Sequence, residues 1–377
     1  MKPKKRIGIV ANTTWNIYNF RLNVIEKLLN EGFDVFVLAP IDEYIEYKER
    51  FPRVIHIPLR VLTRDSKHPL KDLILIAELR RKYKVLNLDL VLHYTHKPNI
   101  YGAIAGKLLS IPTIGVVTGL GYPFLKKGWI EKLVTLMYKM TLGFHKKVIF
   151  ENEDDRILFI DKKIVKQDKA VSIKGCGVNI THFSPNGKSS KEDITRFTFI
   201  GRLLYDKGIK EFVKAASEIK NRYNGTTKFT VVGELDKDNP SSVNPDELAK
   251  WVHEDIIDYK GYVKDVRKVI SDSDCIVLPS YREAIARSLT EAMAMGKPII
   301  TTNVAGCKEA VDDGVNGFIV KVKSSDSLKE AISKMISVGN EERKKMGLAG
   351  RKKAEIEFDD KIIATQIVAE IDSILKD

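Results

Sequence analysis

Short apolar runs alternate with helical patterns along the chain, and this alternation constrains the fold more than any other feature of the sequence. RIGIVAN at 6–12 has the length and branched content of a buried strand, a helical stretch covers 20–30, and DVFVLAP follows as a second strand. A strand, a helix and another strand in that order indicate parallel pairing, because the chain must cross the sheet before it pairs again. The first half of the chain is therefore predicted to be an α/β domain with a largely parallel sheet.

The same alternation starts again after a polar stretch. SPNGKSSKEDIT, between Phe183 and Arg196, is typical of a linker. Beyond it, FTFIGR, FTVVGE, CIVLPSY, PIITTN and GFIV are predicted strands, separated by helical patterns. A chain of 377 residues also exceeds what a single core usually supports. We therefore predict two α/β domains, at 1–183 and 184–357.

The chain carries a net charge of +13 at pH 7, which calls for an anionic partner such as nucleic acid, a membrane surface or a phosphate-rich ligand. The lysines do not gather in one block, so no nucleic-acid-binding module is indicated. The three cysteines lie far apart, without the spacing of a zinc site or a disulfide framework. No signal peptide is recognisable, and no segment approaches the roughly 18 apolar residues of a membrane span. We therefore expect a cytoplasmic protein.

One segment, 126–147, combines basic and apolar residues. Lysine pairs at 126–127 and 146–147 flank an apolar helical pattern that has Trp129 at its edge. A helix of this kind can lie in the surface of an anionic membrane. The alternative is a core helix with ordinary solvated ends. We expect peripheral contact with the inner face of the cell membrane through this segment.

Two carboxylates stand eight positions apart in REAIARSLTE, directly after the predicted strand CIVLPSY. At about 100° per residue, one face of a helix cannot present both of them equally well. The spacing instead favours Glu283 in the loop that leaves the strand and Glu291 two turns into a helix that begins at Arg287 or Ser288. The start of such a helix offers unpaired N–H groups and partial positive charge to a phosphate. The alternative is an exposed amphipathic helix with scattered glutamates.

Two basic residues follow another predicted strand, in FIGRLLYDKGIKEF. Arg202 comes directly after the strand, and Lys207 comes just before a helix. Ligands of open α/β sheets bind beyond the carboxyl ends of the strands, so both cations are expected near Glu283. A pair of cations facing a helix N-terminus can clamp a diphosphate. Taken alone, this motif is also compatible with a solvated basic turn.

Together these motifs resemble glycosyltransferase family 4, the retaining transferases whose two Rossmann-like domains face each other across a cleft, an arrangement called GT-B. The resemblance covers nearly the whole chain and rests on GRLLYDKG, VGELDKDNPSS, YKGYVKDV, the pair Glu283 and Glu291, and FENEDD with GCGVNITHFSP. NIYNFR and GLGYPF are similar to the PglA-type enzymes of the family, which add N-acetylgalactosamine to a sugar on undecaprenyl diphosphate. The resemblance also implies that a helix at 358–377 crosses back to pack on the N-terminal domain.

The resemblance implies that the second domain binds the nucleotide sugar. Arg202 and Lys207 would hold the diphosphate and stabilise the leaving group, Glu283 would orient the transferred sugar, and Glu291 would accept hydrogen bonds from the ribose. The other implied donor-binding residues are Gly201, Gly233, Tyr262, Val263, Ala284, Ile285, Ser288 and Leu289.

No metal or other cofactor is implied, because fixed cations already point to where the diphosphate departs. Asp272 and Asp274 form a DxD sequence, which binds a metal in other transferases. CIVLPS follows at once, so we expect this sequence to end a helix and start a strand instead.

The N-terminal domain is expected to bind the acceptor. The candidate residues are Asn16, Asn19, Arg21, Lys97, Thr118 and Gly119. Asn16, Asn19 and Arg21 are equally compatible with helix capping or a surface turn. His96 has a structural alternative, which leaves Lys97 as the better candidate for an acceptor phosphate.

The chain departs from the family pattern in two places. The family has glycine after the first acid and proline two residues later, where this chain has Ala284 and Ala286. Many members also have histidine at the position of Thr118. A methyl group at 284 can reshape the sugar pocket, so the identity of the donor sugar is what this departure puts in question.

The sequence therefore predicts retaining transfer of a sugar, N-acetylgalactosamine in α linkage, from a UDP-sugar to a sugar on undecaprenyl diphosphate, in bacterial glycan or glycoprotein assembly. A nucleotide-sugar epimerase of similar fold and a non-enzymatic basic binder of lipid or nucleic acid are the alternatives. A dinucleotide oxidoreductase is disfavoured, because ANTTWNIYNF lacks the glycine triad after the first strand.

Overall fold

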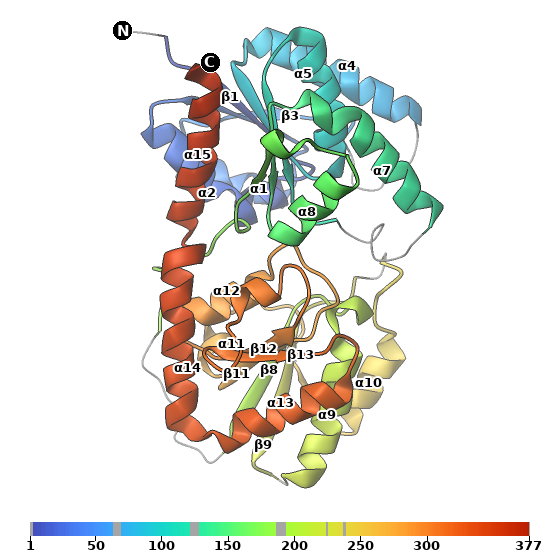
Figure 1. Cartoon of the computed structure of the whole chain (residues 1–377), viewed down its shortest axis with the longest axis vertical. Helices are drawn as coiled ribbons and strands as arrows, with labels where there is room; N and C mark the ends of the chain where they lie inside the picture. Colours follow the sequence, from blue (N-terminus) through green and yellow to red (C-terminus); the bar gives the residue numbers. More distant parts are fainter. Residues whose placement is uncertain are drawn as a thin grey trace. The chain divides into compact units, whose positions relative to one another are not determined.

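The computed structural model describes residues 3–62, 69–120, 128–185, 194–223, 225–236 and 239–376. The chain divides into two compact units, Met1–Gly177 with Asp360–Asp377 and Val178–Asp359 (Figure 1). The change of unit comes before the predicted boundary at 183, because Val178 and Phe183 are already buried in the core of the second unit. At the other end, Phe358 still belongs to that core.

A parallel sheet forms the centre of the first unit. Its described strands are β1 (Arg6–Val10), β2 (Asp34–Ala39), β3 (Ile55–Pro58), β4 (Leu90–Tyr94), β5 (Thr113–Val117), β6 (Lys147–Phe150) and β7 (Ala170–Ser172). They pair in the order β3-β2-β1-β4-β5-β6-β7, every neighbouring pair parallel. All residues of β4 and β5 are buried, as expected for strands that are covered by helices on both faces.

Two hydrophobic cores lie on the two faces of this sheet. The longer helices of the unit are α1 (Thr14–Phe20), α2 (Leu22–Asn30), α4 (Pro69–Leu86), α5 (Ala103–Leu109), α7 (Trp129–Thr141), α8 (Glu153–Asp161) and α15 (Asp360–Lys376); α3 (Tyr47–Arg50) is a single turn. α2 and α15 pack against each other and bury their apolar faces in one core, while α4, α5 and α7 contribute to the other. A π-helix, η2 (Pro98–Gly102), links β4 to α5.

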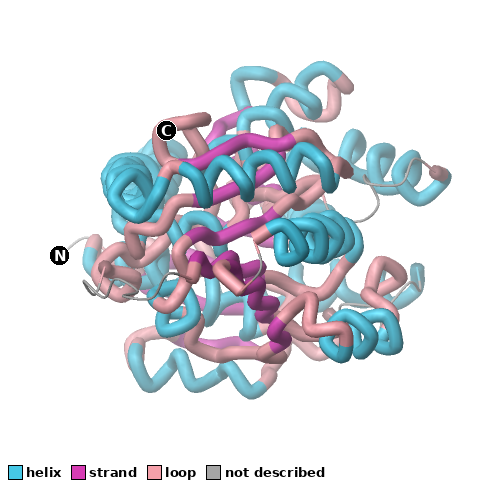
Figure 2. Tube along the Cα trace, turned by 90° about the horizontal axis from the view of Figure 1, so that it is seen from below, coloured by secondary structure: helices cyan, strands magenta, loops and turns pink. Residues whose placement is uncertain are grey.

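The second unit repeats this architecture. Its described strands are β8 (Thr195–Ile200), β9 (Thr227–Val232), β10 (Asp258–Tyr259), β11 (Cys275–Leu278), β12 (Ile299–Thr302) and β13 (Gly317–Val320), in the order β10-β9-β8-β11-β12-β13. The helices are α9 (Ile209–Arg222), α10 (Pro245–His253), α11 (Arg267–Ser271), α12 (Arg287–Ala294), α13 (Ser325–Ser337) and α14 (Gly339–Lys353). Helices flank the strands on both faces (Figure 2). In the core, the Phe229 ring stacks on Phe197 and meets Phe212 edge to face.

The strand order reverses once in each sheet. β1 lies beside β4 in the first sheet, and β8 lies beside β11 in the second. Open α/β sheets bind their ligands outside the carboxyl ends of the strands at such a switch point. The loops after β1 and β4, and those after β8 and β11, are therefore the places where a site is expected.

Candidate functional site

The loop after β8 carries the two predicted clamp residues, Arg202 and Lys207. It ends in a short 3₁₀ turn, Tyr205–Lys207, which is followed by Gly208 in a left-handed conformation with φ of 76°. A Cβ atom at Gly208 would come within 2.1 Å of the Pro279 carbonyl oxygen. Glycine therefore lets the turn lie directly on the chain that leaves β11, and this brings Lys207 to the second loop of the switch point.

The loops after β8 and β9 also touch through their backbones. Gly233 has φ of 149°, and a Cβ atom there would lie 1.8 Å from the carbonyl oxygen of Gly201. The Gly233 amide donates to the Gly261 carbonyl at 2.9 Å, which joins the loop before Tyr262 to the same edge of the sheet. The Tyr262 side chain is exposed and Val263 packs on the core. Gly201, Gly233 and the 262–263 loop are thus adjacent, as a shared donor site requires.

Glu283 lies in the loop after β11, as its spacing from Glu291 predicted. Its two carboxylate oxygens accept hydrogen bonds from Lys207 Nζ at 2.5 and 2.6 Å, and both side chains are largely buried. The backbone is fixed as well, because the Glu283 amide donates to Ala305 and the Ala286 amide donates to Gly306. A Cβ atom at Gly306, whose φ is 78°, would lie 2.4 Å from the Glu283 carbonyl carbon. The loop after β12 therefore holds the acidic loop in position.

The helix α12 begins at Arg287, as predicted, and places Glu291 within it. Ala286 at its N-cap gives no side-chain hydrogen bond to the first turn, which leaves the start of the helix suited to an anion. Glu291 is 7% exposed and accepts a hydrogen bond from Arg287 Nε at 2.7 Å. Burial raises the pKa of Glu291, while the charge of Arg287 opposes that rise. The result is a fixed hydrogen-bond acceptor near the helix start.

The Leu289 amide is bonded within the first turn of α12. This amide donates to the Ala286 carbonyl at 3.0 Å, and the Leu289 side chain is fully buried. The first turn of α12 is closed by this bond, so the Leu289 N–H is already used within the helix. Ala284 and Ile285 lie between β11 and α12, and Ser288 lies in the first turn of α12.

Sequence reasoning missed Asp236, which lies in the loop after β9. One of its oxygens accepts a hydrogen bond from Arg202 Nη1 at 2.6 Å, and the Arg202 side chain is 45% exposed. The signal was present in VGELDKDNPSS, since an acid four residues after a strand end lies at the same sheet edge as the other site residues. The importance of Gly306 was also missed, because nothing in NVAG indicates that its backbone meets Glu283.

In the first unit, Arg21 and Asn16 are tied into the protein itself. The Arg21 guanidinium is 3.5 Å from Glu151, stacks 4.0 Å above the Tyr94 ring, and donates from Nε to Asn16 Oδ1 at 3.4 Å. All of these residues are buried. Burial raises the pKa of Glu151, and the Arg21 charge offsets this by favouring the ionised form. Arg21 therefore neutralises the buried carboxylate of Glu151, which follows β6. To contact an acceptor directly, Arg21 would have to leave this ion pair.

The segment after β4 carries Lys97, the predicted contact for an acceptor phosphate. Lys97 Nζ is 3.2 Å from Asp72 in the first turn of α4, and the Tyr101 hydroxyl donates to the same carboxylate at 2.7 Å. His96 Nδ1 is hydrogen-bonded to the Tyr138 hydroxyl of α7, and burial lowers the pKa of His96. Lys97, the predicted phosphate-binding residue, is thus paired with α4, and the adjacent His96 is hydrogen-bonded to α7.

The remaining acceptor candidates occupy strand and helix ends of the first unit. Asn19 donates from its amide to the Trp15 carbonyl within α1, a local bond that leaves its role as an acceptor contact a prediction. Thr118 and Gly119 follow β5 and are half-buried, with Gly119 in a left-handed conformation at φ of 87°.

The DxD sequence has a structural role. Asp272 pairs with Lys268 at 2.5 Å, and an Asp274 carboxylate oxygen accepts from the Arg196 amide at 2.8 Å. These residues lie between the end of α11 and the start of β11, as predicted. Within the described part of the chain, no three His, Cys, Asp or Glu residues are grouped in a way that suits a metal ion.

Both halves of the chain match known family models. Residues 20–179 match the model described as Glycosyltransferase Family 4, and residues 181–353 match the model described as Glycosyl transferases group 1. The N,N'-diacetylbacillosaminyl-diphospho-undecaprenol alpha-1,3-N-acetylgalactosaminyltransferase of Campylobacter jejuni is 30% identical, over 98% of this chain and 99% of that protein. The UDP-Gal:alpha-D-GlcNAc-diphosphoundecaprenol alpha-1,3-galactosyltransferase of Escherichia coli is 27% identical, over 82% of each chain.

Solved structures show the same fold over the whole length. A glycosyltransferase from Rickettsia africae has a TM-score of 0.82 at 20% identity, over 99% of both chains. Anabaena HepE in complex with UDP and glucose has a TM-score of 0.79 at 18% identity, over 98% of this chain and 100% of that one. The fold and the two family matches define a glycosyltransferase of the GT-B class. The chain belongs to glycosyltransferase family 4.

Proposed function

We propose that this glycosyltransferase transfers N-acetylgalactosamine from UDP-N-acetylgalactosamine, with retention and in α linkage, to a sugar carried on undecaprenyl diphosphate. The observation that carries the donor part is the ion pair of Lys207 with Glu283, which joins the loops after β8 and β11, with Arg202 in the same β8 loop and Glu291 inside α12. The two relatives above are named for acceptors on diphosphoundecaprenol, and the first is named for N-acetylgalactosamine transfer. HepE is named as a complex with UDP.

In this proposal the second unit drives departure of the diphosphate. Arg202, Lys207 and the start of α12 stabilise the negative charge that develops on the leaving phosphate. Glu283 orients the transferred sugar, and Glu291 accepts hydrogen bonds from the ribose. The acceptor hydroxyl attacks the anomeric carbon on the face that the phosphate leaves, and the departing phosphate oxygen takes its proton. Fixed cations serve where other transferases use a metal, so we propose that the reaction requires none.

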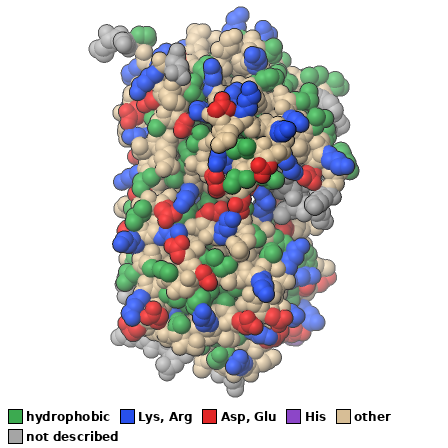
Figure 3. All heavy atoms as spheres, viewed as in Figure 1, with side chains coloured by type: hydrophobic (Ala, Val, Ile, Leu, Met, Phe, Trp, Pro, Cys, Tyr) green, Lys and Arg blue, Asp and Glu red, His purple; other side chains and the backbone are tan. Residues whose placement is uncertain are grey.

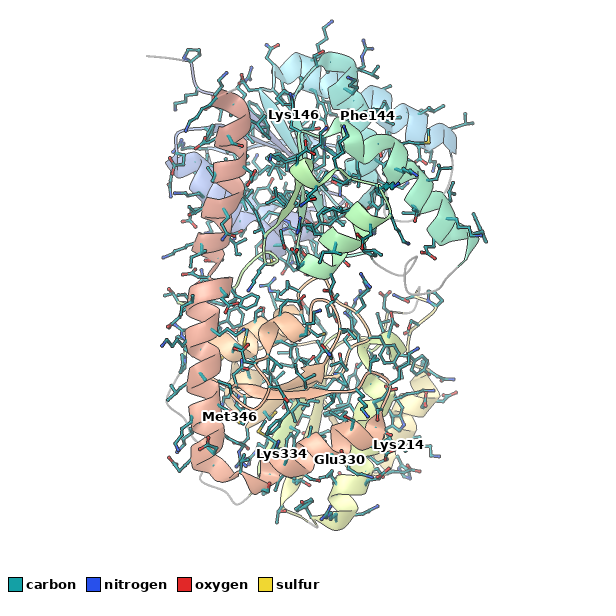
Figure 4. All side chains as sticks on the ribbon, in the orientation of Figure 1. Phe144, Lys146, Lys214, Glu330, Lys334 and Met346 are labelled. Carbon is teal, nitrogen blue, oxygen red and sulfur yellow. The ribbon has the colours of Figure 1, made fainter. Side chains whose placement is uncertain are left out.

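The first unit is proposed to bind the acceptor and the membrane surface. The α7 residues Trp129, Leu133, Leu136 and Met140 recur at helical spacing and are 73%, 47%, 53% and 65% exposed. Phe144 and Lys146 are exposed in the segment that follows α7 (Figure 4). An exposed apolar stripe beside basic residues suits the interface of an anionic membrane.

Other features of the surface bear on membrane contact. Lys126 and Lys127, which belong to the predicted basic segment, lie outside the described residues. Lysine and arginine are spread over the face shown in Figure 3 and do not gather in one patch there. No helix within the described residues has the length and apolar character needed to span a bilayer. The apolar stripe on α7 is therefore the feature that supports a peripheral contact.

The decisive test is a panel of UDP-sugars incubated with a polyprenyl-diphosphate-linked sugar. We expect UDP release to be fastest with UDP-N-acetylgalactosamine, to depend on the acceptor, and to continue in excess EDTA. The anomeric configuration of the product is read by NMR. A faster rate with another UDP-sugar would refute the donor assignment, and interconversion of UDP-sugars without an acceptor would favour the epimerase.

The membrane part is tested separately by vesicle sedimentation with anionic lipids. Replacing both Leu133 and Leu136 with glutamine removes apolar area from the stripe, and we expect binding to fall about tenfold or more. The matched control is Leu348→Gln, which alters a leucine that is 65% exposed in the second unit. Equal partitioning of the double variant and the unaltered protein would reject α7 as the contact.

A further inference from the structure

The donor site of the second unit is electrically balanced before any nucleotide arrives. Arg202 pairs with Asp236, Lys207 pairs with Glu283, and Arg287 pairs with Glu291, at 2.6, 2.5 and 2.7 Å. A diphosphate adds at least two negative charges to this group. Like charges held close together in a partly buried site repel strongly, so binding is favoured if one of these carboxylates moves away from its cation.

The three pairs differ in how readily they separate. Glu291 is nearly buried and lies one helical turn from its partner within α12. Glu283 is held by two hydrogen bonds from Lys207, and its backbone is fixed by Gly306. The Arg202 side chain is 45% exposed, the highest value among the three basic partners. Asp236 is 15% exposed, so water reaches this pair mainly from the arginine side, and of the three pairs the one between Arg202 and Asp236 costs least to open.

Main-chain hydrogen bonds hold the backbone on both sides of Asp236. Glu234 is held to the β8 loop by the bond from the Leu203 amide, and the Asp236 carbonyl accepts from the Asn239 amide in a turn. Both bonds use main-chain atoms, so a rotation of the Asp236 side chain leaves them intact. The side chain of an aspartate has only two rotatable torsions, so its rotation moves the carboxylate without moving the main chain.

We infer that Asp236 occupies the place of the diphosphate on Arg202 when the site is empty, and that a bound nucleoside diphosphate displaces it. The inference rests on the proposed function, since it assumes that Arg202 holds the diphosphate. Asp236 keeps the guanidinium aligned toward the sheet edge, and in doing so it lowers the affinity for nucleotide. The residue therefore sets how tightly donor and product UDP are held, and it speeds release of the product.

The test is calorimetric titration of the whole chain with UDP and with uridine, for the unaltered protein and for Asp236→Asn. The amide has the same shape without the charge, so it competes less well for Arg202. We expect Asp236→Asn to bind UDP about two- to fivefold more tightly in low salt, from the usual size of an exposed ion pair. The gain should shrink in 1 M salt, and uridine binding should stay the same.

Two controls make the result specific. Asp272→Asn removes the same charge from the exposed pair with Lys268, and it should leave UDP affinity unchanged. In an Arg202→Ala background, Asp236→Asn should give no gain, because the competition requires the guanidinium. Circular dichroism and thermal unfolding establish that each variant is folded.

The outcomes separate this inference from the proposed function. Weaker or unchanged UDP binding by Asp236→Asn would overturn the inference, since Asp236 would then support the nucleotide site or play no part in it. A gain that persists without Arg202 would also overturn it. If the unaltered protein bound no UDP, the proposed donor would fail and the inference with it.

Discussion

The two units place charged residues at the same position in the same kind of sheet, but they use them differently. Around the switch point of the second unit, Arg202 lies in an ion pair with nearly half of its side chain exposed. Around that of the first unit, the side chains of Arg21 and Glu151 are only 3% and 9% exposed. A pair that water reaches can be exchanged for a ligand, whereas a buried pair must stay intact to avoid an uncompensated charge. Exposure thus separates a binding residue from a structural one.

The largest effect should come from breaking the buried pair of the first unit. Removing one partner of a buried ion pair typically costs about 3–5 kcal/mol, because the other charge is left uncompensated. We therefore expect Arg21→Met to destabilise the first unit by this amount, measured by hydrogen exchange in peptides from β4 and β6. The double variant Arg21→Met with Glu151→Leu should recover much of the loss. Full stability of Arg21→Met alone would contradict the structural role.

The next effect should appear in catalysis, at the two predicted clamp cations of the second unit. Loss of one group that stabilises developing negative charge costs about 10²–10³ in kcat. We expect Arg202→Ala and Lys207→Ala each to show this loss, and Arg202→Ala to do so with little change in the unfolding temperature. Arg202→Ala should thus lower activity without lowering stability, whereas Arg21→Met should lower stability. Turnover close to normal in both variants would refute the clamp.

These two sites also show which features can be predicted from the sequence and which depend on the tertiary structure. Alternating apolar runs predicted strands β1, β2, β8, β9, β11, β12 and β13 but not the short β7, and the spacing of Glu283 and Glu291 predicted a loop and a helix correctly. Those inferences are local, because strand ends and helix starts follow from neighbouring residues. The burial of Arg21 depends on Glu151, which is far away in the sequence and meets it only through the order of β1, β4 and β6.

Residues that act through a tertiary neighbour were missed for the same reason. Asp72 carries no signal in the sequence, and only the fold brings it to Lys97; the position of Asp236 after a strand end was visible, but its pairing with Arg202 was not. A sequence also does not show which N–H groups in the first turn of a helix are already bonded, as the Leu289 amide is.

A smaller effect is expected from the backbone that supports Glu283. Gly306→Ala would place a methyl group 2.4 Å from the Glu283 carbonyl carbon, so the acidic loop has to shift. A displacement near 1 Å can reduce turnover about 10²-fold, and a partial adjustment should give a loss of about tenfold or more. Both kcat and the affinity for UDP-sugar should be measured.

Gly314→Ala is the matched control for that change. Gly314 has φ of 77°, almost the same as Gly306, but no atom lies within 4 Å of the added methyl group. Both variants pay about 1–2 kcal/mol for the left-handed backbone, and only Gly306→Ala disturbs the acidic loop. Equal activity of the two variants would show that Gly306 does not position Glu283.

The smallest effect should arise in the first unit, at the bond between Tyr138 and His96. Tyr138 is 1% exposed and packs against Phe159, so phenylalanine fills the same space and only the hydrogen bond to His96 is lost. A hydrogen bond contributes about 0.5–1.5 kcal/mol net, which corresponds to roughly two- to tenfold. If this bond aligns His96 and Lys97 for the acceptor, Tyr138→Phe raises the acceptor KM by that factor and leaves kcat at saturating acceptor unchanged.

Tyr83→Phe is the control, because it removes a 2.8 Å bond to His93 within the buried strand and should lower stability without altering KM. Equal acceptor KM in Tyr138→Phe and the unaltered protein would contradict this prediction, because the segment of His96 and Lys97 would then act independently of α7.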